Sequence, residues 1–343
     1  MKRLMAFLLL LCLLPLAGAF CGAAEEAQEP LPEMYSGKMR LAAKVFRSWE
    51  GTQGVDQVGS IREGAWVIIH GYNPTFALVT STQDHVTGFV KRVCIEQIKV
   101  RDEESFPPFG VEFQHYIASI AAQDAPVTTL PGGGETLITL HQGAKIAFIG
   151  FEGGYAKLIY HRQYGYIDSR LLTEAVNVYY DPETASDDAP IAAYTSFYKI
   201  TTDESNLGRM ENIAVACAKL SAMLFQAGDS LNFNSQVGPY SAANGYKKAT
   251  VLTNEVSTQG YGGGTCQVSS TLYNVVLQLP GLTVLQRRAH GNNGASYLPI
   301  HMDAAVGNST LNFRFRNDYG FPIRIDASSQ DGALTIAIYR VQP

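Results

Sequence analysis

The chain has 343 residues, of which 46% are hydrophobic and 17% charged, a composition typical of folded proteins rather than disordered ones. Its formal net charge is -5, and lysine and arginine are not gathered into a basic stripe. Because nucleic-acid binding depends on such clusters, these features exclude nucleic acid as the main partner. The length allows two or three domains.

The amino terminus has the pattern of a secretory signal. Met1-Lys2-Arg3 precedes an apolar stretch that ends in Ala17-Gly18-Ala19, small residues typical of a cleavage site. We predict a signal peptide over residues 1–23, so that the mature protein is secreted or lies in the cell envelope. The alternative is an uncleaved membrane anchor, since the apolar stretch is just long enough to span a bilayer. Contact with a membrane is expected only in that case.

Two similar blocks follow a flexible leader, which we predict over residues 24–37 from its acidic and proline-containing composition. Four groups of residues recur 79 positions later, which indicates a duplicated domain over 38–104 and 112–176. The recurring groups are Ile61 with Leu140, Gly64-Ala65 with Gly143-Ala144, Gly71 with Gly150, and Phe76-Ala77 with Tyr155-Ala156.

Each block consists of short β-branched and aromatic runs between glycine-bearing turns, such as Ala65 to Ile69 and Lys145 to Ile149. This pattern is typical of a small all-β barrel. The order of the glycines and aromatic residues resembles bacterial SH3-like domains, and the resemblance implies binding of cell-wall peptides or glycans. A purely structural spacer is the alternative.

A linker is predicted over 177–193, and a larger domain over 194–343. Apolar residues at helical spacing predict a helix that begins at Thr202 or Asp203 and stops at Gly228. Its apolar stripe consists of Leu207, Met210, Ile213, Cys217, Leu220 and Leu224. Cys217 lies on this stripe and is therefore expected in the core.

A second helix is predicted from about Cys266 to Leu279, where Pro280-Gly281 ends it. Strands follow, and they complete an antiparallel sheet. They are Thr283 to Leu285, Thr310 to Asn317, Ile323 to Ile325 and Leu334 to Tyr339. The predicted fold class is thus multidomain: two small all-β SH3-like barrels followed by an α+β domain with two helices on an antiparallel sheet.

Three glycines place Cys266 at the entry to this second helix. The first N–H groups of a helix have no partner within it, and the helix dipole adds positive charge, so a thiolate there is stabilised and its pKa lowered. His290 lies 24 residues later and is the candidate base, and Asp303 is the candidate that orients its ring. These three residues form the predicted catalytic set.

The same region resembles a known family. The run from Gly262 to Asn274, with Arg287, His290 and the later Asp303-Ala304, is similar to the VanW domain, and the similarity extends over roughly Tyr194 to Tyr339. The resemblance implies a cell-envelope setting and leaves the reaction open. The chain departs from the family pattern near His290, where Gln286, Gly291 and His301 replace the usual residues.

Two other interpretations of the glycine-rich turn stay open. In the first, N–H groups of Gly263, Gly264 and Thr265 bind a carboxylate or phosphate at the helix start. Gln267 and Ser269 are further candidates for binding this ligand, and Arg287 or Arg288 adds positive charge. In the second, the glycines allow close packing, and Cys266 is a small apolar core residue.

Nucleotides and metals are not expected. The turn lacks the lysine that a phosphate-binding loop carries at its helix entry. Cys266, His290 and His301 are zinc-type ligands, but the sequence has no tight ligand pair, and we predict neither a metal nor another cofactor.

These observations predict an exported cell-envelope protein that binds, and through Cys266 remodels, peptidoglycan or a related wall polymer. The enzyme would be a cysteine-dependent acyl transferase or peptidase acting on wall peptides. The alternative is a non-catalytic wall-binding or scaffold module.

Overall fold

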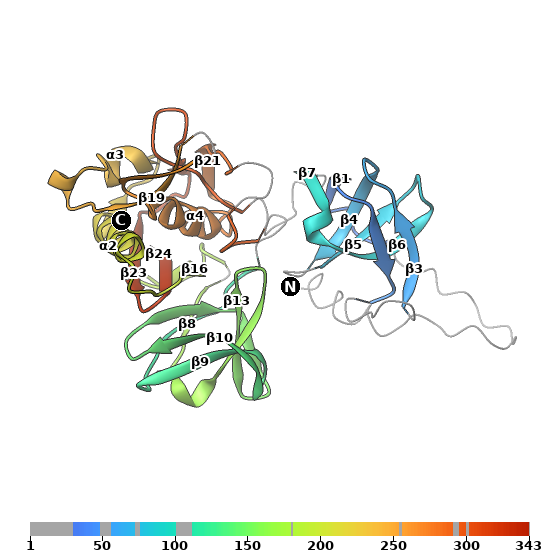
Figure 1. The fold of residues 1–343 in the computed structure, drawn as a ribbon, viewed down its shortest axis with the longest axis horizontal. Helices are drawn as coiled ribbons and strands as arrows, with labels where there is room; N and C mark the ends of the chain where they lie inside the picture. Colours follow the sequence, from blue (N-terminus) through green and yellow to red (C-terminus); the bar gives the residue numbers. More distant parts are fainter. Residues whose placement is uncertain are drawn as a thin grey trace, which may run out of the picture. The chain divides into compact units, whose positions relative to one another are not determined.

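A computed structural model describes residues 30–48, 56–72, 76–100, 112–179, 181–253, 256–290, 295–299 and 302–342. The predicted signal peptide and residues 24–29 of the predicted leader lie outside these residues. The leader prediction runs too far, because residues 35–37 are already part of strand β1 (Tyr35–Met39), where Tyr35 is buried. The described chain is mostly β, with antiparallel sheets and few helices (Figure 1). Within these ranges, no sheet closes into a barrel by strand pairing, and no helix has the length and apolar character needed to cross a membrane.

Residues 35–100 form a seven-stranded sheet in the order β3-β2-β6-β5-β4-β1-β7. Buried and partly exposed residues alternate in β5, so one face of the sheet packs inward. A short 3-10 helix, Arg92–Cys94, follows β6. The strands are β1 (Tyr35–Met39), β2 (Ala43–Phe46), β3 (Gln57–Ile61), β4 (Trp66–Tyr72), β5 (Phe76–Ser81), β6 (Val86–Lys91) and β7 (Ile95–Val100).

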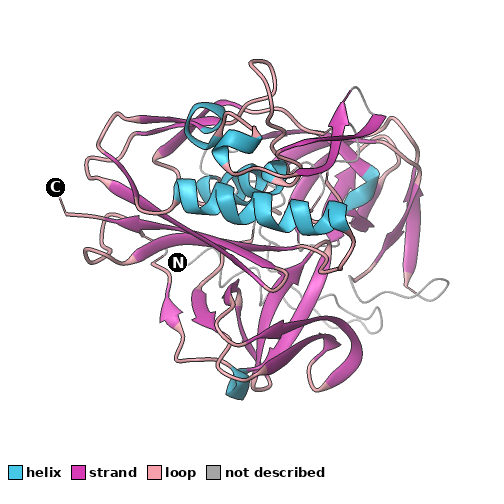
Figure 2. Ribbon diagram, turned by 60° about the vertical axis from the view of Figure 1, so that its left-hand side comes forward, coloured by secondary structure: helices cyan, strands magenta, loops and turns pink. Residues whose placement is uncertain are grey.

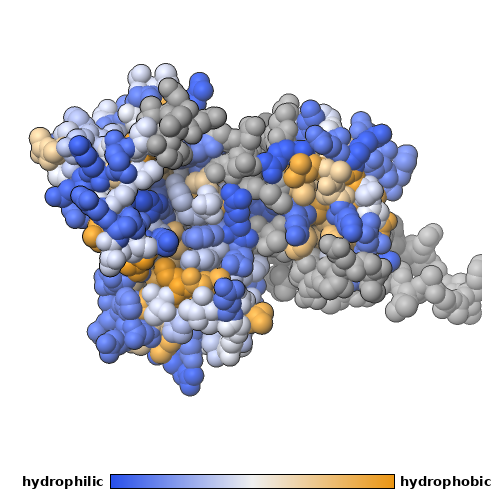
Figure 3. All heavy atoms as spheres, in the orientation of Figure 1, coloured by the Kyte–Doolittle hydropathy of each residue, from blue (hydrophilic) through white to orange (hydrophobic). Residues whose placement is uncertain are grey.

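Residues 112–179 form two sheets, in the orders β10-β9-β14-β13-β12 and β11-β8-β15. Here too a 3-10 helix, Ser169–Leu171, precedes the last strand. Figure 3 shows apolar surface among hydrophilic residues over the β8 to β10 part of this region. The strands are β8 (Tyr116–Ser119), β9 (Asp124–Leu130), β10 (Gly133–His141), β11 (Lys145–Phe148), β12 (Gly150–Glu152), β13 (Tyr155–Tyr160), β14 (Gln163–Asp168) and β15 (Val176–Asn177). The SH3-like character of both regions stays a prediction.

The C-terminal domain is built on the antiparallel sheet β16-β24-β23-β17. Helices α2 (Glu204–Leu220) and α4 (Thr265–Val276) contact each other and pack on this sheet (Figure 2). The sheet strands are β16 (Pro190–Phe197), β17 (Met223–Phe225), β23 (Ile323–Gln330) and β24 (Ala333–Arg340). The remaining elements are β18 (Ser230–Asn232), α3 (Phe233–Val237), the 3-10 helix Ala242–Asn244, β19 (Lys248–Thr253), β20 (Val256–Tyr261), β21 (Leu282–Gln286) and β22 (Arg314–Asn317).

Strand β16 is buried along its whole length because both of its faces are covered. On one face, Thr195 accepts a hydrogen bond of 2.7 Å from the N–H of Ala147, in β11 of the preceding region. On the other, Ser196 hydrogen-bonds Thr271 of α4 at 2.7 Å. The carboxyl end of the predicted linker, residues 190–193, is therefore part of the central sheet.

The structure corrects two predicted elements. Helix α2 ends at Leu220, before the predicted stop, because Ser221 is extended and Ala222 has a φ of +62°. Leu224, expected on the apolar stripe, instead lies in β17 with 50% of its surface exposed. The strand predicted from Thr310 begins only at Arg314.

The late start of this strand has a local cause. The side-chain oxygen of Asn308 accepts hydrogen bonds from the N–H groups of Thr310 and Leu311, at 2.9 and 2.8 Å. Those donors are held in a turn and are not available to a strand ladder. The turn at Asn308 therefore delays the start of the strand that the alternating apolar pattern predicts from Thr310.

Candidate active site

The glycine-rich turn fits tightly between α2 and β19. Gly264 caps α4 with a φ of +107°, and a Cβ there would lie 2.9 Å from the carbonyl oxygen of Arg209. A Cβ on Gly263 would lie 2.5 Å from the carbonyl oxygen of Thr250. Only glycine fits both positions without displacing its neighbours. Cys266, the second residue of α4, is thereby held at a fixed place on the domain.

Polar side chains of α4 hold the segment 302–306 against the helix. Ser269 donates to the carbonyl of Ala304 at 2.6 Å, and Asn274 donates to that of Met302 at 2.7 Å. Ser270 accepts from the N–H of Ala304 at 2.9 Å. These bonds place Asp303, which lies between the two anchored residues, beside α4.

His290 and Asp303 form a close pair. One carboxylate oxygen of Asp303 lies 2.6 Å from His290 Nδ1 and also accepts the backbone N–H of His290 at 2.6 Å. The Asp303 side chain is fully buried, and Arg287 Nη2 lies 3.4 Å from its other oxygen. Because Nδ1 faces the carboxylate, the orientation of the imidazole ring is fixed.

The Cys266 sulfur lies between the imidazole and the backbone of Val306. It accepts the N–H of Val306 at 3.5 Å and donates to the carbonyl oxygen of Val306 at 3.4 Å, and it interacts electrostatically with the His290 side chain. Since Nδ1 bonds the carboxylate, Nε2 is the ring nitrogen left for the sulfur. The structure thus brings together the three residues of the predicted catalytic set.

The two titratable partners of Cys266 have shifted pKa values. Burial alone would lower the pKa of His290, but its hydrogen bonds to Asp303 and Cys266 raise it to about 10. Burial alone would raise the pKa of Asp303, whereas its hydrogen bonds from His290 and the charges of His290 and Arg287 lower it. At neutral pH the site therefore holds an imidazolium against a carboxylate.

Three further side chains interact electrostatically with Cys266. Tyr240 donates to Asn234 at 2.8 Å, and burial, followed by the charge of Cys266, raises its pKa. The pKa of Tyr297 is raised by the same two causes. Arg209 also interacts electrostatically with Cys266. Sequence analysis assigned no role to these three residues. Arg209 and Tyr240 lie outside the motif, and their proximity depends on packing between distant elements.

The residues predicted to hold an anion are largely engaged inside the domain. The N–H groups of Thr265 and Gln267 donate to the carbonyls of Gly262 and Gly264, at 3.1 and 2.9 Å. The buried Gln267 amide donates to Ser196 at 3.0 Å. Arg287 contacts Asp303, and Ser269 contacts Ala304, as described above. The ligand-binding role of these residues stays a prediction.

Within the described part of the chain, no group of three or more His, Cys, Asp or Glu side chains is arranged to hold a metal ion. His301, weighed above as a zinc ligand, lies outside the described residues, as does Gly291.

Comparison with known proteins shows what the C-terminal domain is similar to. Residues 208–339 match the family described as "VanW like protein". The chain is 30% identical to the uncharacterized protein YoaR of Bacillus subtilis over 194 residues, which are 55% of this chain and 62% of that protein. It is 33% identical to the vancomycin B-type resistance protein VanW of Enterococcus faecalis over 113 residues, 31% of this chain and 40% of that one. The chain thus spans less than two thirds of the length of either relative.

Solved structures give a weaker likeness. NlpC1 from Trichomonas vaginalis is 14% identical, covering 92% of this chain and 94% of that one, with a TM-score of 0.18. A TM-score this low carries no argument about fold or function.

Proposed function

We propose, from the premise that its C-terminal domain is VanW-like, that this chain is an exported cell-envelope protein that remodels peptidoglycan or a related wall polymer through Cys266. The relative named for vancomycin resistance supports a cell-wall-related role. The two β regions before this domain are the proposed wall-binding part. The substrate is a wall peptide, and the reaction is acyl transfer or hydrolysis at one of its amide bonds.

One observation carries the enzymatic proposal: a cysteine at a helix start interacts electrostatically with a histidine whose Nδ1 lies 2.6 Å from a fully buried aspartate. Cysteine catalysis needs a nucleophile, a proton carrier and a group that orients this carrier. Cys266, His290 and Asp303 fit these roles in that order. A histidine that only filled space would not need a buried carboxylate to orient it.

The proposed reaction uses Cys266 as the nucleophile and His290 as the proton carrier. The Cys266 thiolate attacks the amide carbonyl, the carbon–nitrogen bond breaks, and the His290 imidazolium gives its proton to the leaving amine. A thioester with Cys266 results. Water or an acceptor amine then attacks this thioester, loses a proton to His290 and releases Cys266. Water gives a peptidase, and an amine gives a transferase.

The test is incubation of the full chain with purified wall peptides, followed by mass spectrometry of the products. We expect peptides shortened by hydrolysis or joined by transfer, and none with Cys266→Ala. Cys217→Ala is the matched control, because Cys217 is a buried cysteine of the same domain. If the chain binds wall material but the parent and Cys266→Ala give identical product profiles, the protein is a non-catalytic module.

A further inference from the structure

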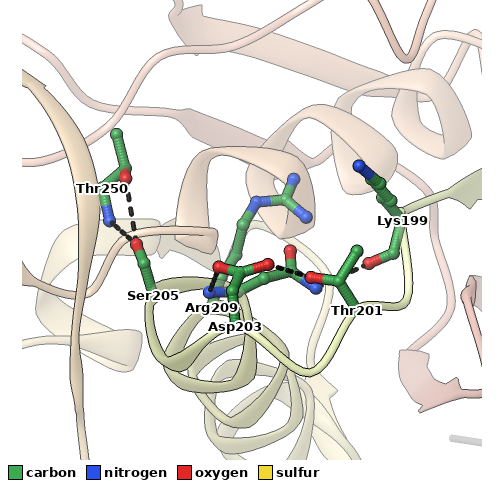
Figure 4. A pocket seen from close by; sticks show the side chains of 7 residues that line it. Lys199, Thr201, Asp203, Ser205, Arg209 and Thr250 are labelled. Carbon is green, nitrogen blue, oxygen red and sulfur yellow. Dashed lines mark hydrogen bonds between the residues drawn. The ribbon is translucent and has the colours of Figure 1, made fainter.

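A polar pocket of about 230 Å³ lies where the chain enters α2 (Figure 4). Its lining is made of charged, hydroxyl-bearing and amide side chains, without a large apolar one among them. Those that Figure 4 labels are Lys199, Thr201, Asp203, Ser205, Arg209 and Thr250. Such a lining suits a small charged group rather than an apolar ligand.

Arg209 belongs both to this pocket and to the surroundings of Cys266. Its side chain packs on the glycine-rich turn, since a Cβ on Gly264 would lie 3.0 Å from Arg209 Cγ. Its Nη2 donates to the side-chain oxygen of Gln267, the residue after Cys266. It also interacts electrostatically with Cys266 and Tyr297. The Arg209 side chain therefore connects the pocket with the surroundings of the proposed nucleophile, Cys266.

Among the described residues, the guanidinium of Arg209 has no carboxylate as a partner. Among the described residues its hydrogen-bond partner is the neutral Gln267 amide, and no ion pair joins it to a carboxylate. A partly buried cation is costly unless an anion compensates it. Arginine also stays protonated at physiological pH, so the charge is not relieved by loss of a proton.

The other charged residues of the pocket leave a positive balance. Asp203 is committed to capping α2, since its carboxylate accepts the N–H of Asn206 at 2.9 Å and the hydroxyl of Thr201. Lys199 is exposed and contributes a second cation. In Figure 4 the Lys199 and Arg209 side chains point in the same direction, away from the backbone near Asp203. Two cations and one carboxylate that is already hydrogen-bonded give the pocket a positive charge balance, which favours binding of an anion.

We propose that this pocket is a substrate subsite that takes a free carboxylate of the wall peptide, with Arg209 as the residue that binds it and Lys199 as a supporting cation. The planar guanidinium matches a carboxylate through paired hydrogen bonds. This inference rests on the proposed function, because it assumes that the substrate of Cys266 is a peptide. It adds a specificity: peptides with a free carboxyl group are bound in preference to their amides.

The test measures binding without turnover. The full chain carrying Cys266→Ala is titrated by calorimetry with acetyl-D-alanyl-D-alanine and with the same peptide as its C-terminal amide. We expect the free acid to bind at least about tenfold more tightly, the difference that a charge-assisted hydrogen bond contributes. Adding Arg209→Gln should remove this preference, and adding Lys199→Gln should weaken it a few-fold. Lys247→Gln, an exposed lysine outside the pocket, is the matched control and should have no effect.

Equal binding of acid and amide, binding of neither, or an unchanged preference in both pocket variants would overturn the proposal. Circular dichroism checks the fold of Arg209→Gln, and the exposed Lys199→Gln keeps the test decisive if that fold is lost. Because the protein titrated lacks the Cys266 thiol, failure of the subsite is distinguishable from failure of the enzymatic proposal.

Discussion

Two cysteines on the helices of one domain have opposite surroundings. Cys217 lies in α2 with 3% of its surface exposed, packed in the apolar core, and burial raises its pKa to about 12. Cys266 lies at the start of α4, partly exposed and beside a histidine whose pKa is raised to about 10. The comparison teaches that the surroundings, and not the residue type, decide which thiol can act as a nucleophile.

The largest expected difference between the two cysteines is in activity. Cys266→Ala should lower the turnover of wall peptides by more than about 1,000-fold, because it removes the nucleophile. Cys217→Ala should leave turnover within a few-fold of the parent. Product formation followed by mass spectrometry measures both. Combining Cys266→Ala with His290→Ala should cost little more than either change alone, since the residues act as a unit. Independent, additive losses would contradict the shared role.

The next largest effect concerns Asp303, the aspartate of the Cys266 site. Asp303→Asn should lower turnover by about 100-fold or more, because the ring of His290 loses its orienting carboxylate. The same change removes the anion that favours the imidazolium. The alkaline limb of the rate profile should therefore move down from about pH 10 toward about 6.5, the ordinary value of histidine.

Stability provides a second readout of this pair. The pKa of His290 is raised on folding, so its contribution to the free energy of unfolding is complete below about pH 6.5 and is lost as the pH rises through about 10. Asp303→Asn should flatten that decline in chemical denaturation. A parent and variant with the same alkaline limb and the same decline would contradict the pairing.

Chemical reactivity gives a smaller and independent contrast. Iodoacetamide at neutral pH should label Cys266 at least about tenfold faster than Cys217. Cys94 is partly exposed, but burial raises its pKa, and it should react at an intermediate rate. Peptide mapping of the labelled chain measures all three sites in one sample. Equal labelling of Cys266 and Cys217 would show that the two environments do not differ as described.

The smallest effect tests the turn that positions Cys266. Gly264→Ala should lower the free energy of unfolding by about 2–4 kcal/mol, because a positive φ is combined with a close contact to the Arg209 backbone. Gly228→Ala is the matched control: its φ is +85°, but a Cβ there meets open space. It should cost only about 1–2 kcal/mol. Equal losses in urea denaturation would remove the argument for tight packing.

Part of this site could be predicted from sequence. Three glycines before an apolar helical pattern mark the start of α4, and a cysteine there with a later histidine and aspartate suggests a nucleophile. The mostly antiparallel β character also follows from local patterns. Arg209, however, reads as an ordinary surface residue of α2, because its role depends on how α2 packs against the glycine-rich turn.

Other features depend on contacts that no local pattern encodes. Strand β16 is buried on both faces because the preceding β region covers one of them. The local sequence does not encode this contact, and the first residues of β16 therefore resemble a linker. Leu224 continues the helical spacing of α2, yet the chain turns at Ala222 and places it in an exposed strand. The apolar period alone does not reveal such a turn.

The most direct test of the central claim is to trap the intermediate on Cys266. The full chain is mixed with wall peptides, quenched in acid within the first turnover and examined by intact-mass and peptide-mapping spectrometry. The account predicts a thioester adduct of the substrate acyl group on Cys266, absent from Cys266→Ala and unaffected by Cys217→Ala. Conversion of the peptides with no adduct on Cys266, and at the same rate in Cys266→Ala, would contradict it.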